Sequence, residues 1–140
     1  LLKAGADKVC LPMRTDFLDT ASKSFGSQCI MVSIEHGKNF LASNILALMA
    51  QNHGAGEILL QSIERDGTMR GYDLELIASV AKAVKVPVIA SGGCSGYEDM
   101  LNAIKAGASA VAAGALFLFT EATPKGAAEY LNKHGIEVRL

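Results

Sequence analysis

The chain has 140 residues, half of them hydrophobic, and a formal net charge of −1. This size and composition suit one compact domain with an apolar core, which we place over residues 1–140. No basic patch is interleaved with aromatic side chains, so we expect no nucleic-acid partner. No stretch approaches the ~18 uncharged apolar residues of a membrane helix, so we expect a cytoplasmic protein without membrane contact.

The cysteines and histidines lack the spacing that disulfide frameworks and metal sites require. Cys10, Cys29 and Cys94 lie far apart, in or beside apolar segments, which is typical of reduced cysteines. The three histidines are equally scattered. We therefore expect no metal site and no cofactor.

Apolar runs of strand length alternate along the chain with segments of helical periodicity. The predicted strands are, in chain order, 7–12, 29–35, 57–63, 87–91 and 110–117. The predicted helices are 15–25, 40–53, 73–84, 96–106 and 124–134. Strands that are apolar throughout suit a parallel sheet covered on both faces, or the interior of a barrel. The pattern predicts an α/β fold of about five βα units.

A short motif recurs where three of these strands begin. AGADKV (4–9), HGAGEI (53–58) and AGASAV (106–111) each place a helix-ending glycine, an alanine and the first strand residues in the same order. The glycines are separated by 49 and 53 residues, about two βα units. A (β/α)₈ barrel contains such a βαβα repeat four times, but it needs about 200 to 250 residues. We therefore expect a partial TIM-type barrel.

Acidic, hydroxyl and glycine residues follow the predicted strands at their carboxyl ends, where function collects in parallel α/β folds. Glu35 follows the second strand, and Asp66, within ERDGT (64–68), follows the third. Both carboxylates can transfer protons. SGGCSG (91–96) follows the fourth strand and AGAL (113–116) ends the fifth. Three glycines in these loops let backbone N–H groups approach an anion closely: Gly67, Gly92 and Gly93.

Each of these features also has a simpler interpretation. Asp66-Gly67 is a favoured turn pair, and Gly92-Gly93 can be a tight strand-to-helix connection without a ligand. Glu35 alone can be a solvated loop carboxylate. The coincidence of all three at strand ends favours the functional interpretation.

Five segments together resemble one family. They are GADKV (5–9), FGSQ (25–28), GAGEILLQSIERDGTMRGYD (54–73), PVIASGG (87–93) and KHGIEVRL (133–140). They are similar to the cyclase subunit of imidazole glycerol phosphate synthase, of histidine biosynthesis. The resemblance covers essentially the whole chain and corresponds to the last five of the family's eight βα units. We therefore expect an excerpted or truncated N-terminus, in which LLKAG (1–5) is the end of a helix.

The resemblance implies a lyase and cyclase reaction that uses ammonia from a glutaminase subunit. One catalytic aspartate of the family lies in the missing units, and the second corresponds to Glu35, a longer carboxylate. Asp66 matches an aspartate that lines the family's active site. The family's long excursion after the strand that ends at Glu35 is absent, and one of its two phosphate sites is altered at Pro12-Met13. The other phosphate site is expected at Gly67, Ser91, Gly92, Gly93, Gly114 and Ala115, with alanine last where the family has serine.

Four polar residues lie where predicted strands begin: Asp7, Lys8, Gln28 and Glu57. The resemblance implies that the glutaminase docks on this side and that Lys8 and Glu57 belong to an ammonia gate. They can equally be solvated groups at the rim of the sheet.

Three functions stay open on the sequence. The chain is a piece of the cyclase that works with a glutaminase, a partial barrel that only binds phosphorylated metabolites or assembles, or a divergent amidotransferase-linked synthase. Because one catalytic aspartate is missing and the other is replaced, we expect no cyclase activity from the chain alone. Five βα units leave the strands at 7–12 and 110–117 as open edges, so we also expect a homo-oligomer.

Overall fold

The structure is a computed structural model that describes residues 1–37 and 39–138. Within these ranges the strands form one parallel sheet, in the order β1 (Val9–Pro12), β2 (Ile30–His36), β3 (Glu57–Ser62), β4 (Val88–Ser91) and β5 (Ala110–Ala112). The helices are α1 (Thr15–Phe25), α2 (Phe40–Asn52), α3 (Leu74–Ala83), α4 (Tyr97–Lys105), α5 (Ala115–Phe119) and α6 (Pro124–Lys133), with short 3₁₀ helices η1 (Leu2–Ala4) and η2 (Ser27–Cys29).

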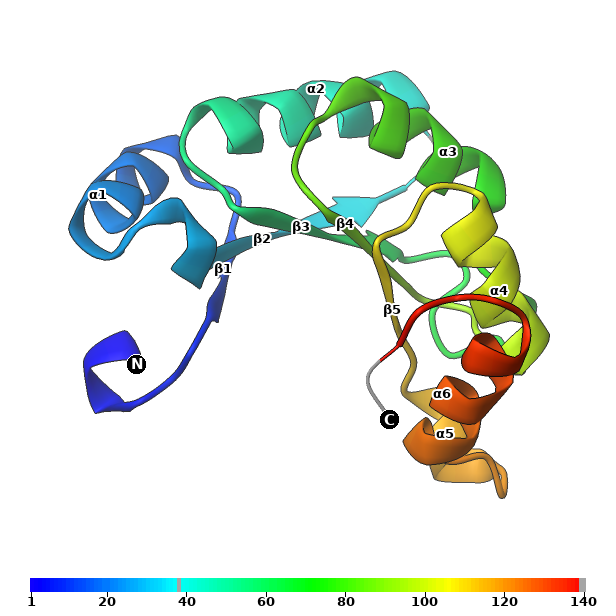
Figure 1. Ribbon diagram of the computed structural model, residues 1–140. Helices are drawn as coiled ribbons and strands as arrows, with labels where there is room; N and C mark the ends of the chain where they lie inside the picture. Colours follow the sequence, from blue (N-terminus) through cyan, green and yellow to red (C-terminus); the bar gives the residue numbers. More distant parts are fainter. Residues whose placement is uncertain (38, 139–140) are drawn as a thin grey trace.

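The sheet bends into an arc that carries helices on its convex side and leaves its concave side open (Figure 1). The N-terminus lies near one end of this arc, and α6 lies near the other (Figure 1). Five parallel strands that alternate with helices in this way confirm the predicted α/β fold and its likeness to part of a TIM barrel.

Several helices begin where the sequence provides a capping side chain. Asn39, Asp73 and Thr123 each accept a hydrogen bond from the backbone amide three residues later, at 3.0 to 3.2 Å. Pro124 occupies the first turn of α6, where its missing N–H would have had no helical partner. These caps satisfy amides that the helix itself leaves free and fix where α2, α3 and α6 start.

The core lies between the sheet and the helices on its convex side. Alternate residues of β2 and β3 are buried there, because successive side chains of a strand point to opposite faces. The fully buried strand residues include Ile30, Val32, Ile34, Ile58, Leu60 and Val88. The other half of each strand therefore faces the concave side, where it can contact a ligand.

The predicted strand at 110–117 is wrong beyond Ala112, because α5 begins at Ala115. The partner strand β4 ends at Ser91, which pairs with Ala112, so later residues have no parallel strand to bond. The chain turns instead, and the amides of Phe117 and Leu118 both donate to the carbonyl of Gly114 at 3.1 Å. A short apolar run such as ALFLF suits a helix as well as a strand, so its sequence alone gave no distinction.

Within the described residues, β1 pairs only with β2 and β5 pairs only with β4. The two open edges of the sheet are therefore confirmed. Association of two chains through these edges stays a prediction.

Candidate functional site

A row of side chains crosses the concave face at the carboxyl ends of the strands. Glu35 pairs in register with Gln61, which pairs with Ser91, which pairs with Ala112. Residues in register on parallel strands face the same side of the sheet. Since neighbouring strands lie about 4.8 Å apart, Glu35 and Ser91 are roughly 10 Å apart across the sheet.

Asp66 is presented at this edge by the turn that follows β3. Its amide donates to the carbonyl of Ser62 at 3.0 Å, and Gly67 turns the chain with a φ of 72°. Its carboxylate is exposed and accepts a hydrogen bond of 3.2 Å from Nε2 of Gln61. The simple interpretation of Asp66-Gly67 as a turn is thus correct, and the turn is what holds the carboxylate above the sheet.

A small pocket of about 20 Å³ joins the loops that follow β3, β4 and β5. It is lined by Asp66, Gly67, Met69, Ser91, Gly92, Gly93, Cys94, Ala113, Gly114 and Ala115. All six residues expected at a phosphate site therefore meet here, together with Asp66. A pocket of this size takes one small group, and the rest of any ligand must lie over the concave face. Binding of phosphate there stays a prediction.

Both glycines of the β4 loop are required by close approach of backbone. A Cβ on Gly92 would lie 2.7 Å from the carbonyl oxygen of Ser62, and one on Gly93 would lie 2.3 Å from that of Gly71. Both residues also have positive φ, of 93° and 98°. The packing of the β3 and β4 loops therefore explains Gly92-Gly93 without a ligand, and the glycines by themselves are no evidence for one.

Two side chains at the pocket, Cys94 in its lining and Tyr72 nearby, are neutral at physiological pH. Burial raises the pKa of the Cys94 thiol above its ordinary value, and it also raises the pKa of the Tyr72 hydroxyl, with a further contribution from its hydrogen bond to Cys94. The Tyr72 hydroxyl donates to the carbonyl of Ala112 at 2.9 Å, which ties the β3 loop to β5. Asp66 is thus the charged side chain among the residues that line the pocket.

Arg65 lies next to Asp66 in the chain but braces the loop. Its Nη1 lies 3.4 and 3.3 Å from the carbonyl oxygens of Gly71 and Tyr72, and its Nε lies 3.8 Å from the carboxylate of Asp73. These contacts hold the loop in the shape that brings Gly71 against Gly93. Arg65 is absent from the pocket lining, so an anion there would depend on backbone amides and the hydroxyl of Ser91.

The structure places Glu35 at the exposed end of β2, one strand away from Asp66. The next residue, His36, is buried, with Nδ1 2.7 Å from Oγ of Ser43 and its ring centroid 5.0 Å from that of Phe40. Gln61 lies in register beside Glu35 and donates to Asp66, so it links the strands that carry the two carboxylates.

Sequence reasoning did not single out four residues of this region: Gln61, Met69, Cys94 and Ala113. Cys94 and Ala113 nevertheless lie within the loops SGGCSG (91–96) and AGAL (113–116) that it had placed at this edge. The signal for Gln61 was present, because it lies two residues after Leu59 and four after Glu57 on the same face of β3. Met69 gave no such signal, since its place in the pocket depends on a positive φ of 52° that is uncommon outside glycine.

At the opposite, amino-terminal side of the sheet, Nζ of Lys8 forms an ion pair with the carboxylate of Glu57. The two residues expected in a gate are therefore in contact. Gln28 instead donates from Nε2 to the carbonyl of Phe25 at 3.4 Å, within its own turn, and Asp7 is exposed. A role of these residues in ammonia transfer or glutaminase docking stays a prediction.

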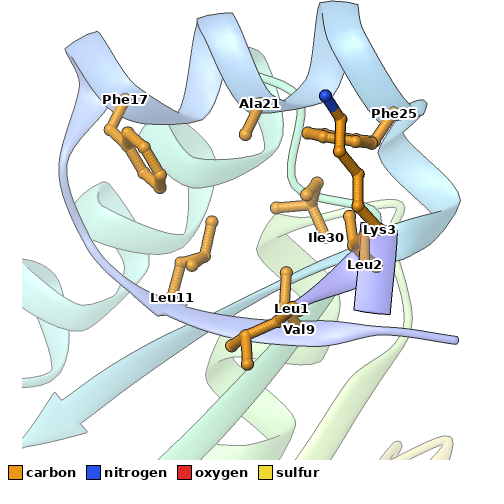
Figure 2. A pocket seen from close by; sticks show the side chains of 9 residues that line it. All are labelled: Leu1, Leu2, Lys3, Val9, Leu11, Phe17, Ala21, Phe25 and Ile30. Atoms are coloured by element: carbon orange, nitrogen blue, oxygen red, sulfur yellow. The ribbon is translucent and has the colours of Figure 1, made fainter. Parts of the chain in front are cut away.

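A larger cavity of about 290 Å³ lies between η1, β1 and α1 (Figure 2). It is lined by Leu1, Leu2, Lys3, Val9, Leu11, Phe17, Ala21, Phe25 and Ile30. Figure 2 shows Phe17, Ala21 and Phe25 of α1 directed across it toward the β1 side. This lining is apolar except for Lys3, so it suits hydrophobic side chains rather than a phosphorylated substrate. The candidate site is the smaller pocket.

Among residues 1–37 and 39–138, no three His, Cys, Asp or Glu side chains lie close enough together to hold a metal ion. In the same part of the chain, no helix combines the length and the apolar character that crossing a bilayer requires.

Two solved structures illustrate the likeness of the fold. Thiamine phosphate pyrophosphorylase from Pyrococcus furiosus matches with a TM-score of 0.68 and 24% identity, over 94% of this chain and 60% of that one. FabK from Thermotoga maritima matches with a TM-score of 0.64 and 21% identity, over 83% of this chain and 35% of that one. This chain thus spans a third to three fifths of these proteins, and identities this low show the fold alone.

The sequence itself matches a family model described as "Histidine biosynthesis protein" over residues 1–123. The match includes both candidate carboxylates and every residue that lines the small pocket. It agrees with the pathway that the sequence segments had indicated. The chain belongs to the histidine biosynthesis protein family.

Proposed function

We propose that this chain binds the phosphate group of a phosphorylated metabolite in the pocket after β3, β4 and β5, as part of a cyclase of the imidazole glycerol phosphate synthase type. One observation carries the proposal. Residues from three separate loops, chosen on sequence as phosphate contacts, line a single pocket beside Asp66 at the carboxyl edge of the sheet. That edge is where parallel α/β proteins bind their ligands.

The geometry also supports acid–base chemistry on a ligand that is anchored in this way. A phosphate in the pocket places the adjoining carbon chain over the row from Ser91 to Glu35, which spans roughly 10 Å. Asp66 then lies near the anchored end and Glu35 near the far end. In the proposed reaction Asp66 and Glu35 move protons on opposite parts of the ligand.

A second candidate, a partial barrel that binds phosphate without cyclase activity, is favoured by a different observation. The other phosphate site of the family falls at Pro12-Met13, and Pro12 is the last residue of the edge strand β1, with no backbone N–H to offer an anion. A substrate with two phosphates would be held at one end. Docking of a glutaminase at the Lys8–Glu57 ion pair is part of the first candidate only.

The binding proposal is tested by titrating the ¹⁵N-labelled chain with inorganic phosphate and then with ribose 5-phosphate, followed by NMR. We expect the largest amide shifts at Gly92, Gly93 and Ala115, and a higher affinity for the sugar phosphate. Shifts confined to residues near Lys8 would contradict the assignment.

A matched pair of variants separates the pocket from a general effect of charge. Ala115→Asp places a carboxylate in the pocket lining, and we expect it to weaken phosphate binding at least tenfold. Ala6→Asp adds the same charge at an exposed position before β1, at the other end of the sheet, and should leave binding unchanged. Equal losses in both variants would show that net charge, not the pocket, controls binding.

A further inference from the structure

The side chain of Gln61 lies between the two candidate carboxylates on the concave face. Gln61 pairs in register with Glu35 on one side and with Ser91 on the other. Neighbouring strands lie about 4.8 Å apart, so Gln61 is one strand away from Ser91, which lines the small pocket. Gln61 itself is half-buried and lies outside that lining. It would therefore contact the part of a ligand that leaves the pocket rather than the phosphate group.

The neighbouring carboxylate fixes which way the Gln61 amide points. Its nitrogen, Nε2, lies 3.2 Å from Oδ2 of Asp66. An ionised carboxylate only accepts hydrogen bonds, so the end of the amide that faces Asp66 must be the NH₂ group. The amide oxygen, Oε1, is therefore the end that remains for other contacts.

The free end of this amide is an acceptor that has no donor within the protein. In the part of the chain that the structure describes, Oε1 of Gln61 accepts no hydrogen bond and no buried side-chain oxygen lacks a partner, so Oε1 is open to solvent. The carboxylates of Glu35 and Asp66 on either side of it are acceptors as well. A ligand that lies along this row thus meets a series of acceptors.

We propose that Gln61 selects among phosphorylated ligands, because its Oε1 accepts a hydrogen bond from an O–H or N–H group near the phosphate-bearing end of the ligand. This inference rests on the proposed phosphate site and names the class of ligand that fits it. That class is a phosphate monoester whose carbon chain carries hydroxyl or N–H donors. A chain without donors would cover Oε1 and leave it unpaired, which costs binding free energy.

A simpler role for Gln61 is to brace Asp66. The hydrogen bond between the two side chains would then only hold the turn after β3, and a change at Gln61 would disturb the pocket wall that Asp66 forms. Such a brace affects every ligand of the pocket alike. A selecting residue affects only those ligands that extend beyond the phosphate group and donate hydrogen bonds, so the two roles differ in a measurable way.

The test compares three ligands by NMR titration of the whole ¹⁵N-labelled chain: inorganic phosphate, ribose 5-phosphate and n-pentyl phosphate. The two esters have the same number of carbon atoms, but only the sugar has hydroxyl donors. Gln61→Met keeps the size of the side chain and removes the amide. We expect it to weaken binding of ribose 5-phosphate about three- to tenfold, the value of one hydrogen bond, without weakening binding of the other two ligands.

Asn132→Leu is the matched control for this variant. It also replaces an amide by an apolar side chain, but at an exposed position of α6 outside the pocket lining. We expect it to leave the affinities for all three ligands unchanged. Thermal melts check that both variants fold as the wild type does.

Asp66→Asn is a second test, because it changes the group that fixes the amide. Asparagine offers both a donor and an acceptor, so either end of the Gln61 amide can face it. Oε1 is then no longer held toward the ligand. We expect this variant to lower the preference for ribose 5-phosphate over inorganic phosphate, in the same direction as Gln61→Met.

Three results would overturn the inference. They are an unchanged affinity of Gln61→Met for ribose 5-phosphate, an equal loss for all three ligands, which would make Gln61 a brace, and a preference that Asp66→Asn leaves unchanged. Each of these can occur while inorganic phosphate still binds at the pocket of the wild-type chain. A wild-type chain that binds no phosphate there would instead refute the proposed function, and this inference with it.

Discussion

Replacing Gly93 by alanine tests whether the loops around the pocket are held by the backbone contact that the structure shows. An added Cβ would lie 2.3 Å from the carbonyl oxygen of Gly71 and 2.9 Å from Cβ of Arg65. An unstrained carbon–oxygen contact needs about 3.3 Å, so one loop must move by about 1 Å. That movement strains the hydrogen bond of 2.7 Å from the Gly71 amide to the Gly93 carbonyl.

The cost follows from these contacts. The φ of 98° at Gly93 lies in the left-handed region, which costs other residues about 1 to 2 kcal/mol. Overpacking against a fixed backbone costs about 1 to 3 kcal/mol more. We therefore expect Gly93→Ala to lose about 2 to 5 kcal/mol of unfolding free energy, a large part of the about 5 to 15 kcal/mol that holds a typical domain.

Urea denaturation measures this loss, and the chain offers a matched control. Gly114 also lines the pocket, but its φ is −115° and an added Cβ would meet nothing within 4 Å. We expect Gly114→Ala to change stability by no more than about 0.5 kcal/mol. If Gly93→Ala unfolds at the same urea concentration as the wild type, the close approach of Gly71 and Gly93 does not exist in solution.

Three further predictions concern charge and catalysis. The pKa values of Tyr72 and Cys94 are raised in the folded state, so the folded state holds these protons more tightly than the unfolded state does. The free energy of unfolding is therefore highest below the ordinary thiol pKa of 9.0 and falls as pH rises above it. A melting temperature that stays unchanged between about pH 7.5 and 10.5 would contradict this prediction. Asp66→Asn removes a negative charge from the pocket at nearly constant shape and should tighten phosphate binding about three- to tenfold by NMR titration. Weaker binding would mean that the charge or the hydrogen bonding of the carboxylate, which accepts from Gln61, supports the pocket. With ammonium at high pH and the family's substrate, the chain alone should show no cyclase turnover, and Glu35→Asp should not restore it. The reason is that each positioned acid or base contributes about 10² to 10⁴-fold to the reaction rate. Turnover by the chain alone that Asp66→Asn abolishes would contradict this prediction.

The sequence predicted the regular elements well where hydrophobic period and length agreed. The helix expected at 15–25 is α1, with the same bounds, and the first four strands lie within two residues of their expected limits. The exception is the run that ends in ALFLF. This run leaves the sheet and forms a helix because its neighbouring strand β4 ends at Ser91. The length of that neighbour is not encoded in the local sequence of the run.

The candidate site was predictable because of topology. Carboxyl ends of parallel strands meet at one edge, so residues after β3, β4 and β5 had to lie near one another. What could not be predicted were contacts between loops. The brace from Arg65 to Gly71, and the approach of Gly71 to Gly93, depend on the path of an irregular segment. These contacts explain glycines that the sequence alone had suggested as anion ligands.

The charges at the pocket do not favour tight binding of a phosphate, so the proposed function needs further contacts with the ligand. The pocket lining contains no cationic side chain that could pair with an anion. Arg65 donates its hydrogen bonds to carbonyls of its own loop, and the charge of Asp66 repels a phosphate dianion. Backbone amides and Ser91 would therefore orient a phosphate more than they would bind it tightly. The remaining binding energy must come from the part of the ligand outside the pocket, which lies over the concave face between Ser91 and Glu35. A catalytic role thus depends on further protein surface that covers the concave face and holds the ligand in place, because misplacement by about 1 Å can lower the reaction rate on the order of 10²-fold.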